Sequence, residues 1–169
     1  MHRRNLLKSD KSLICFRSAK ELADQLGHAR DQAVSVGRIA SILEQRGQTD
    51  EALRIRREEE LPVYERLGDV RSKAVTMGQI ADILHQRGQT DEALRIYREE
   101  CLPVCEGLGD VRSQATCKWA IGMMLIHRKN HKDYREGLEH LQWAVETAER
   151  LQLGEAAPLR QTLNRLLGK

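Results

Sequence analysis

The chain contains the same nine-residue segment, or phrase, at two places. GQTDEALRI occupies residues 47–55 and returns at residues 88–96, 41 positions later. The similarity extends beyond the phrase, because residues 27–67 and 68–108 align without a gap and are identical at 28 of 41 positions. A duplication of this length is typical of tandem repeat proteins, in which each repeat packs mainly on its neighbours. The sequence therefore predicts a stack of similar units.

Composition favours an all-helical protein. Aromatic residues make up 4% of the 169 residues, while Ala, Leu, Arg, Glu and Gln are abundant, a mixture that favours helices over β-sandwiches or barrels. The 28 basic and 25 acidic residues give a net charge of +3, which lends no support to nucleic-acid binding. No apolar run approaches the roughly 18 residues of a membrane span. We therefore expect a soluble, cytoplasmic protein without a membrane partner.

Each repeat has the pattern of a helical hairpin. In the second copy, DVRSKAVTMGQIADILHQRG has apolar residues at three- and four-residue spacing and predicts a first helix of about 17 residues that ends near Gly88. Gly88 can adopt the left-handed backbone conformation that commonly ends a helix, and Thr90 is then the expected N-cap of the second helix. That second helix contains Pro103, as the first copy contains Pro62. Because proline removes a backbone donor and crowds the preceding turn, we expect a kink or a short break there.

At these positions the chain resembles the tetratricopeptide repeat family. The matching positions in the second copy are Met77, Ile80, Ala81, Leu84, Ala93, Tyr97 and, displaced by about two residues, Pro103. The match lies in the spacing and size of the residues more than in their identity. The period exceeds the family's usual 34 or so residues, as in extended bacterial and kinesin-light-chain-like versions of the repeat. The resemblance implies an all-α, right-handed α-solenoid of antiparallel helical hairpins.

The resemblance implies a single array over residues 10–168, with residues 1–9 disordered. Its expected parts are a half repeat at 10–26, repeats at 27–67, 68–108 and 109–153, and a terminal capping helix at 155–168. The half repeat aligns with a second helix whose apolar side is Leu13, Ile14 and Phe16. In the terminal helix, Leu163 and Leu166 can cover the open end of the last hairpin. We expect a longer corner loop in the third repeat and a total of eight helices.

The sequence contains no constellation that predicts catalysis. His127 and His131 are four residues apart, as in a helical metal pair, but they fall at a helix end and in the following loop, with no further ligand nearby in the sequence. Cys101 and Cys105 share that spacing, although the first copy has other residue types there. We therefore expect no metal, reduced thiols and no cofactor. No phosphate loop or nucleophile motif is present, so an enzyme is not expected.

The acidic runs RREEEL and REEC alternate arginine with glutamate. At these spacings the charges form pairs three and four residues apart on a helix. We interpret them as a solvated, mutually paired face rather than as a site.

In this repeat family the first helix of each hairpin lines the concave surface. Carrying over that spacing gives three sets of residues, namely Val34, Gly37, Ser41, Glu44 and Gln45; Val75, Gly78, Asp82, His85 and Gln86; and Thr116, Trp119, Met123, Ile126 and His127. The third set is the most apolar. Trp119 and Met123 either pack under the terminal helix or anchor an apolar side chain of a partner. The resulting candidate partner-binding residues are Trp119, Met123, Asp82, His85, Gln86, Ser41 and Gln45.

The favoured function is a non-catalytic scaffold that binds a protein or peptide on its concave face, as part of a larger protein. The alternative is a ligand-sensing or oligomerisation arm of a bacterial signalling ATPase or transcription regulator. A structural spacer, which needs no pocket, is a third option. Self-association through the open half repeat at the N-terminus is a further expectation.

Overall fold

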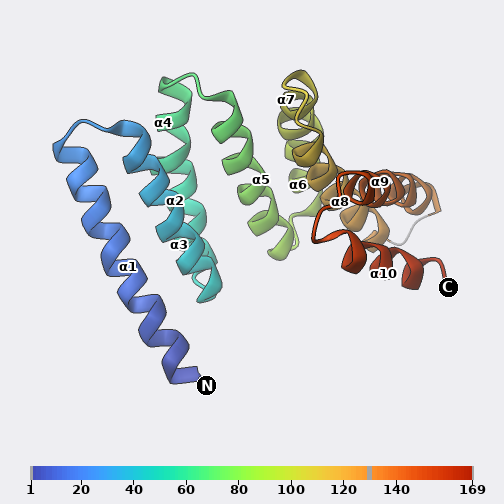
Figure 1. Cartoon of the computed structure of the whole chain (residues 1–169), viewed down its shortest axis with the longest axis horizontal. Helices are drawn as coiled ribbons and strands as arrows, with labels where there is room; N and C mark the ends of the chain where they lie inside the picture. The colour runs from blue at the N-terminus through green and yellow to red at the C-terminus, as the bar shows by residue number, and fades with distance from the viewer. Residues whose placement is uncertain (1, 129–130, 169) are drawn as a thin grey trace. The chain divides into compact units, whose positions relative to one another are not determined.

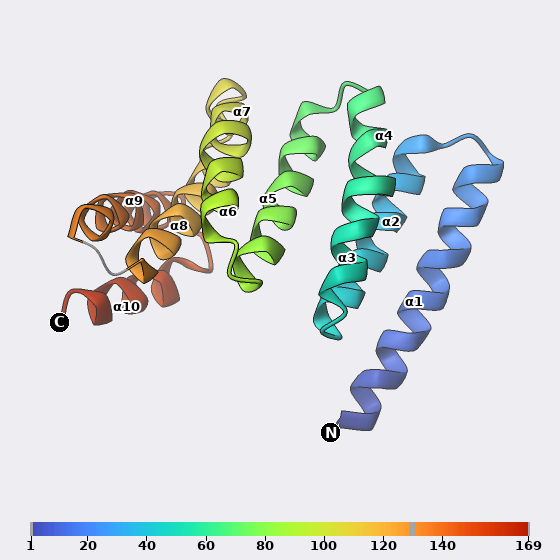
Figure 2. The same ribbon diagram turned by 180° about the vertical axis from the view of Figure 1, so that it is seen from behind.

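The structure, a computed structural model, describes residues 2–128 and 131–168, with side chains from residue 9 onward. Its helical segments are shown in Figures 1 and 2. They are α1 (His2–Gln25), α2 (Ala29–Gln45), α3 (Thr49–Ile55), η1 (Arg56–Glu60), α4 (Leu61–Arg66), α5 (Val70–Gln86), α6 (Thr90–Ile96), η2 (Tyr97–Cys101), α7 (Leu102–Gly107), α8 (Val111–His127), α9 (His131–Arg150) and α10 (Ala156–Leu166). No helix in this described part is long and apolar enough to cross a membrane.

The all-α prediction is confirmed. Because α3, η1 and α4 follow one another without a gap, as do α6, η2 and α7, the described residues form eight helices packed as sequential antiparallel pairs. The chain divides into two compact units, residues 1–83 and 84–169, which are described separately below. The right-handed superhelical twist stays a prediction.

The repeated phrase forms the corner between two helices, as expected. Gly47 and Gly88 adopt positive φ values of +76° and +80°, which glycine tolerates because it has no Cβ. The expected N-cap is wrong: Gln89 holds that position without a side-chain bond, and Thr90 is the first residue of α6. The hydroxyl of Thr90 instead lies 3.0 Å from Nδ1 of His85.

The prolines widen the second helix rather than break it. Residues 56–60 and 97–101 are π-helical, and the backbone N–H of Leu61 donates to the carbonyl of Arg56 five residues earlier. Pro62 follows directly, with no N–H and with a ring that crowds the carbonyl four residues before it. A wider turn relieves that crowding while the helix continues. The same arrangement recurs before Pro103.

In the first unit, α2 packs against both α1 and the helix that contains α3, η1 and α4. Ala33 of α2 forms a core cluster with Val63 and Tyr64. The half repeat matches its prediction in part, because Leu13 is buried whereas Ile14 is exposed. In addition, α1 begins at His2, although we expected residues 1–9 to be disordered; Met1 lies outside the described residues.

The second unit is closed by the terminal helix. Ile126, Leu141, Val145 and Leu163 form its core cluster, so α10 packs against α8 and α9. At the crossing of α8 and α9, a Cβ on Gly122 would lie 2.8 Å from the carbonyl oxygen of Gly137. Glycine at both positions therefore allows the two helices to approach closely. The corner loop that we expected to be longer falls partly on residues 129–130, outside the described residues, and the bounds of α8 and α9 leave three residues for it, as many as lie between α2 and α3.

Candidate functional site

A groove of about 300 Å³ lies between α2 and α5 in the first unit. Its walls and floor are formed by Val34, Gly37, Arg38, Ser41, Glu60, Tyr64, Arg71, Ser72, Val75, Thr76 and Gln79. Val34 and Val75 are exposed apolar side chains, and the guanidinium groups of Arg38 and Arg71 are at exposed positions. This groove therefore contains four of the residues that were predicted to line the concave surface, namely Val34, Gly37, Ser41 and Val75.

A buried ion pair lies below this groove. Nη1 of Arg56 donates to Oε2 of Glu60 over 2.9 Å, and the two residues are only 1% and 5% exposed. The hydroxyl of Thr76 donates to the other carboxylate oxygen of Glu60 over 3.1 Å. The same Arg56 guanidinium also donates to Gln79 Oε1 over 2.7 Å and to Ser41 Oγ over 2.9 Å. Side chains from three helices thus converge on one pair of opposite charges.

Gly37 makes room for the Glu60 carboxylate. A Cβ built at position 37 would lie 2.5 Å from Oε1 of Glu60, a distance shorter than real carbon–oxygen contacts. Glycine in the middle of α2 weakens the helix slightly, but here it allows a charged group to lie directly against the backbone. Gly37, which the sequence analysis placed on the concave surface, therefore accommodates a side chain of the neighbouring helix.

Burial raises the pKa of the Glu60 carboxyl above its ordinary value, while the charge of Arg56 and the hydrogen bond from Thr76 act in the opposite direction. The cost of removing the carboxylate from water is the larger effect. A buried carboxylate with a raised pKa is found both in binding sites and in structural networks. In this position it contributes hydrogen-bond acceptors to the floor of the groove.

The interpretation of RREEEL as a solvated face is wrong for two of its residues. Arg54 does pair with Glu51, Glu58 and Glu59 on the exposed side of the helix. Arg56 and Glu60, however, are buried. A signal was present in the sequence, because the aligned second copy has the less polar Tyr97 and Cys101 at these positions. Such residues in a close copy indicate that the positions face the core.

The predicted partner-binding residues are divided between the two units. In the first unit, Ser41 is half-buried in the groove, and Gln45 and Asp82 are exposed. In the second unit, Gln86 is exposed, and the ring of His85 is stacked on that of His127 with centroids 6.1 Å apart. Of this set, Ser41 is the member that lines the groove between α2 and α5.

Trp119 and Met123 pack against the core cluster of the second unit, which includes Leu163 of α10. This packing favours the alternative in which they lie under the terminal helix. Trp119 also borders a hollow of about 200 Å³, together with Thr116 and Leu159. The tryptophan therefore has one side in the core and one side at a small surface cavity.

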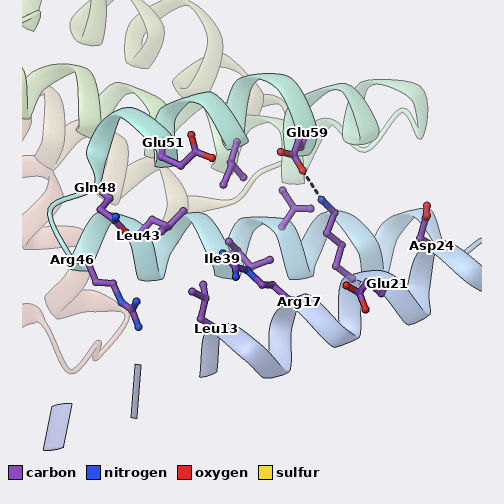
Figure 3. Close-up of a pocket in the computed structure, with 13 residues that line it drawn as sticks. Leu13, Arg17, Glu21, Asp24, Ile39, Leu43, Arg46, Gln48, Glu51 and Glu59 are labelled. Carbon is purple, nitrogen blue, oxygen red and sulfur yellow. Dashed lines mark hydrogen bonds and ion pairs between the residues drawn. The ribbon is translucent and has the colours of Figure 1, made fainter. Parts of the chain in front are cut away.

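A second, larger pocket of about 610 Å³ lies between α1, α2 and the helix formed by α3 and η1 (Figure 3). Its apolar floor consists of Leu13, Val36, Ile39, Leu43 and Ile55, and charged side chains surround it. Nζ of Lys20 reaches across to Oε2 of Glu59 at 2.6 Å. This bond lowers the pKa of the Glu59 carboxyl. This pocket is not evident in the sequence, because it depends on how α1 packs.

The two histidines that we considered as metal ligands belong to different helices. His127 is the last residue of α8 and His131 the first of α9. Within the described residues, no group of three or more His, Cys, Asp or Glu side chains is arranged to hold a metal ion. Cys101, Cys105 and Cys117 are buried free thiols, and Cys15 is an exposed one.

Comparison with known proteins gives a structural relative. The chain resembles the crystal structure of BtubC (BKLC) from P. vanneervenii, with a TM-score of 0.75 and 19% sequence identity. The match covers 94% of this chain, which spans 65% of the length of that one. At this level of identity the similarity shows the fold alone, an all-helical array of antiparallel hairpins. No family model matches the sequence, and no curated protein matches it.

Proposed function

We propose that this chain is a non-catalytic scaffold that binds a polypeptide segment of a partner protein. The observation that supports this proposal is the groove between α2 and α5, which is formed by first-helix positions of two consecutive repeats. In arrays of this type, function depends on extended surfaces rather than on reactive groups. The likeness to BtubC supports the fold on which the proposal rests.

The groove has the chemistry of a side-chain pocket. Val34 and Val75 offer exposed apolar area, while Ser41 and Gln79 place polar atoms beneath it. Arg38 and Arg71 add positive charge at the edge. We expect a partner segment with a small apolar side chain next to an acidic one, because the apolar group would cover the valines and the carboxylate would meet the arginines.

The proposal is tested by selecting peptides from a random phage-displayed library on the whole 169-residue chain. Selected peptides are then measured against Val75→Arg and Val70→Arg. Both valines are exposed in α5, but Val75 lines the groove and Val70 does not. We expect Val75→Arg to weaken binding by about tenfold or more and Val70→Arg to leave it unchanged. Equal binding to both variants would contradict the proposal.

In the second unit, we propose Trp119 and Met123, with His85 and Gln86 as polar neighbours, as a second contact for the same partner. The hollow beside Trp119 supports this. Aromatic and thioether side chains dominate the energetics of many interfaces. The competing explanation for Trp119 is a structural role, because it packs against the cluster that contains Leu163.

The alternative function, a ligand-sensing arm of a bacterial signalling ATPase or transcription regulator, is favoured by the pocket beneath α1. Its volume of about 610 Å³ is in the range of small-molecule sites, roughly 300–1,000 Å³. The Lys20–Glu59 pair bridges the pocket, so a ligand entering it would have to displace that bond. Saturable binding of a small molecule that Lys20→Ala alters would favour this alternative over the scaffold.

A further inference from the structure

The helix α1 has apolar side chains on two faces. Leu13 and Ala23 are buried on the side that packs in the first unit. On another face, Ile14 and Leu22 are 64% and 56% exposed. Exposed Ser18 lies between them, one turn from each, so that the three residues form a row with four-residue spacing. This second face is not explained by the packing within the unit.

The repeat shows what kind of element such a face accommodates. Ile14 and Leu22 align, at the 41-residue period, with Ile55 and Val63. Those residues are only 7% and 5% exposed, because α2 packs antiparallel against the helix that contains them. The row on α1 therefore has the positions that, in the following repeat, are covered by an antiparallel helix. Leu26 is left out of this argument, because its counterparts Leu67 and Leu108 are exposed as well.

We propose that this face binds α1 of a second copy of the chain, forming a two-fold symmetric dimer. The row is self-complementary, because an antiparallel pair with Ser18 on the axis places Ile14 of each copy opposite Leu22 of the other. A symmetric interface needs this property. Ser18 is small, so the helices can approach closely at the crossing point, and rows with four-residue spacing pack into each other in the most common helix–helix geometry.

The charges of α1 fit the same arrangement. Exposed Lys11 lies beyond the Ile14 end of the row, and the exposed, uncharged Gln25 lies beyond the Leu22 end. In the antiparallel pair with Ser18 on the axis, Lys11 of one copy lies opposite the uncharged Gln25 of the other. The two Lys11 side chains lie at opposite ends of the interface. A parallel pair would instead place like charges side by side, so charge favours the two-fold arrangement.

The oligomeric state of the whole chain tests the proposal. Sedimentation equilibrium over about 1 to 100 µM is expected to show a monomer–dimer equilibrium. The double variant Ile14→Glu/Leu22→Glu is expected to raise the dimer dissociation constant by about 100-fold or more, because it brings four like charges into the apolar interface. The matched control, Leu67→Glu/Leu108→Glu, changes two other exposed leucines and should leave dimerisation unchanged. Far-UV circular dichroism checks that both variants stay helical.

A cross-link locates the axis. In a Cys15→Ser background, which removes the exposed thiol, Ser18→Cys is expected to give a disulfide-linked dimer under mild oxidation, since the two Cα atoms at the crossing lie within disulfide range. Gln142→Cys, an exposed position in α9, serves as the control and should stay monomeric. A wild-type chain that is monomeric throughout, or a dimer that survives Ile14→Glu/Leu22→Glu, would overturn the proposal. Binding of a different protein's helix by a monomeric chain would also overturn it.

Discussion

Arg56 and Glu60 form an ion pair inside the first unit, with Nη1 of the arginine 2.9 Å from Oε2 of the glutamate and almost no exposure of either residue. In the next repeat the same positions hold Tyr97 and Cys101, which are also buried. Two copies of one hairpin thus fill the same place by different chemistry. Among the described side chains, Nε of Arg56 is a buried nitrogen without a hydrogen-bond acceptor. Such a pair costs desolvation energy that its attraction only partly offsets.

Removing one partner of the pair should be strongly destabilising. For Arg56→Ala we expect the free energy of unfolding at pH 7 to fall by about 3–5 kcal/mol, because Glu60 would remain buried without its counter-ion. Chemical denaturation measures this change. The loss should become smaller as the pH falls, because protonation makes the buried Glu60 neutral.

Replacing the ion pair together with its hydrogen-bond partners in α5 should have a much smaller effect. The variant carries the residues of the following repeat and combines Arg56→Tyr, Glu60→Cys, Thr76→Cys and Gln79→Ala. We expect its stability to lie within about 1 kcal/mol of the wild type or above it. A loss as large as that of Arg56→Ala would show that the network itself stabilises the repeat.

Asp69 caps the start of α5. Its Oδ1 accepts from the backbone N–H of Ser72 at 3.1 Å, and this bond, together with the Ser72 hydroxyl, lowers the pKa of the carboxyl below 3.8. A lowered native pKa contributes stability above the unfolded value of 3.8 that is lost as the pH falls through the native value. At pH 7, Asp69→Ala should cost about 0.5–2 kcal/mol.

The pH dependence of Asp69→Ala distinguishes a cap from an ordinary surface charge. The difference in stability between the wild type and the variant should shrink as the pH falls below 3.8 and disappear below the lowered pKa of the native carboxyl. Glu106→Ala, which removes an exposed carboxylate at the end of α7, should change stability by less than about 0.5 kcal/mol at every pH. A pH-independent loss for Asp69→Ala would refute the cap.

Leu84 tests the register of the hairpins. It is buried in the first helix of the second repeat, so Leu84→Ala should lower the free energy of unfolding by about 2–5 kcal/mol. Val75→Ala, on the exposed side of the same helix, should change it by less than about 0.5 kcal/mol. Denaturant unfolding followed by circular dichroism measures both variants. A melt unaffected by Leu84→Ala would eliminate the proposed register.

Trp119→Ala separates the two roles of the tryptophan. If it contacts a partner, the variant should lose capture of a library-selected peptide while keeping most of its helical signal. If Trp119 is instead a core residue in contact with the Leu163 cluster, the variant should lose about 3–5 kcal/mol of stability. Binding and melting measured on the same sample distinguish the cases. An unfolded variant, or one that binds normally, would remove Trp119 from the site.

The sequence predicted the features that depend on local residue spacing within the repeat. Helix α5 has the expected length, 17 residues, and Gly88 has the expected positive φ, because both depend on local spacing and on the conformational freedom of glycine. Proline at position 62 predicted a disturbance of the helix. Its form, a widened π turn, depends on how the surrounding helix relaxes.

Burial was harder to predict, because it depends on what lies opposite each side chain. The charges of Arg56 and Glu60 suggested a surface position, and only the comparison with Tyr97 and Cys101 contained the contrary signal. Ile14 shows the opposite case, an apolar residue that the half repeat leaves exposed. Both errors have one cause, because residue type alone does not show which side of a helix is covered by a neighbouring element.

Nuclear magnetic resonance mapping of a library-selected peptide on the isotopically labelled chain tests the scaffold proposal most directly. The proposal predicts that the largest shifts of backbone amides occur at Val34, Ser41 and Val75, which line the groove between α2 and α5. Shifts confined to the exposed acidic face around Arg54 and Glu58, with the groove residues unchanged, would contradict it.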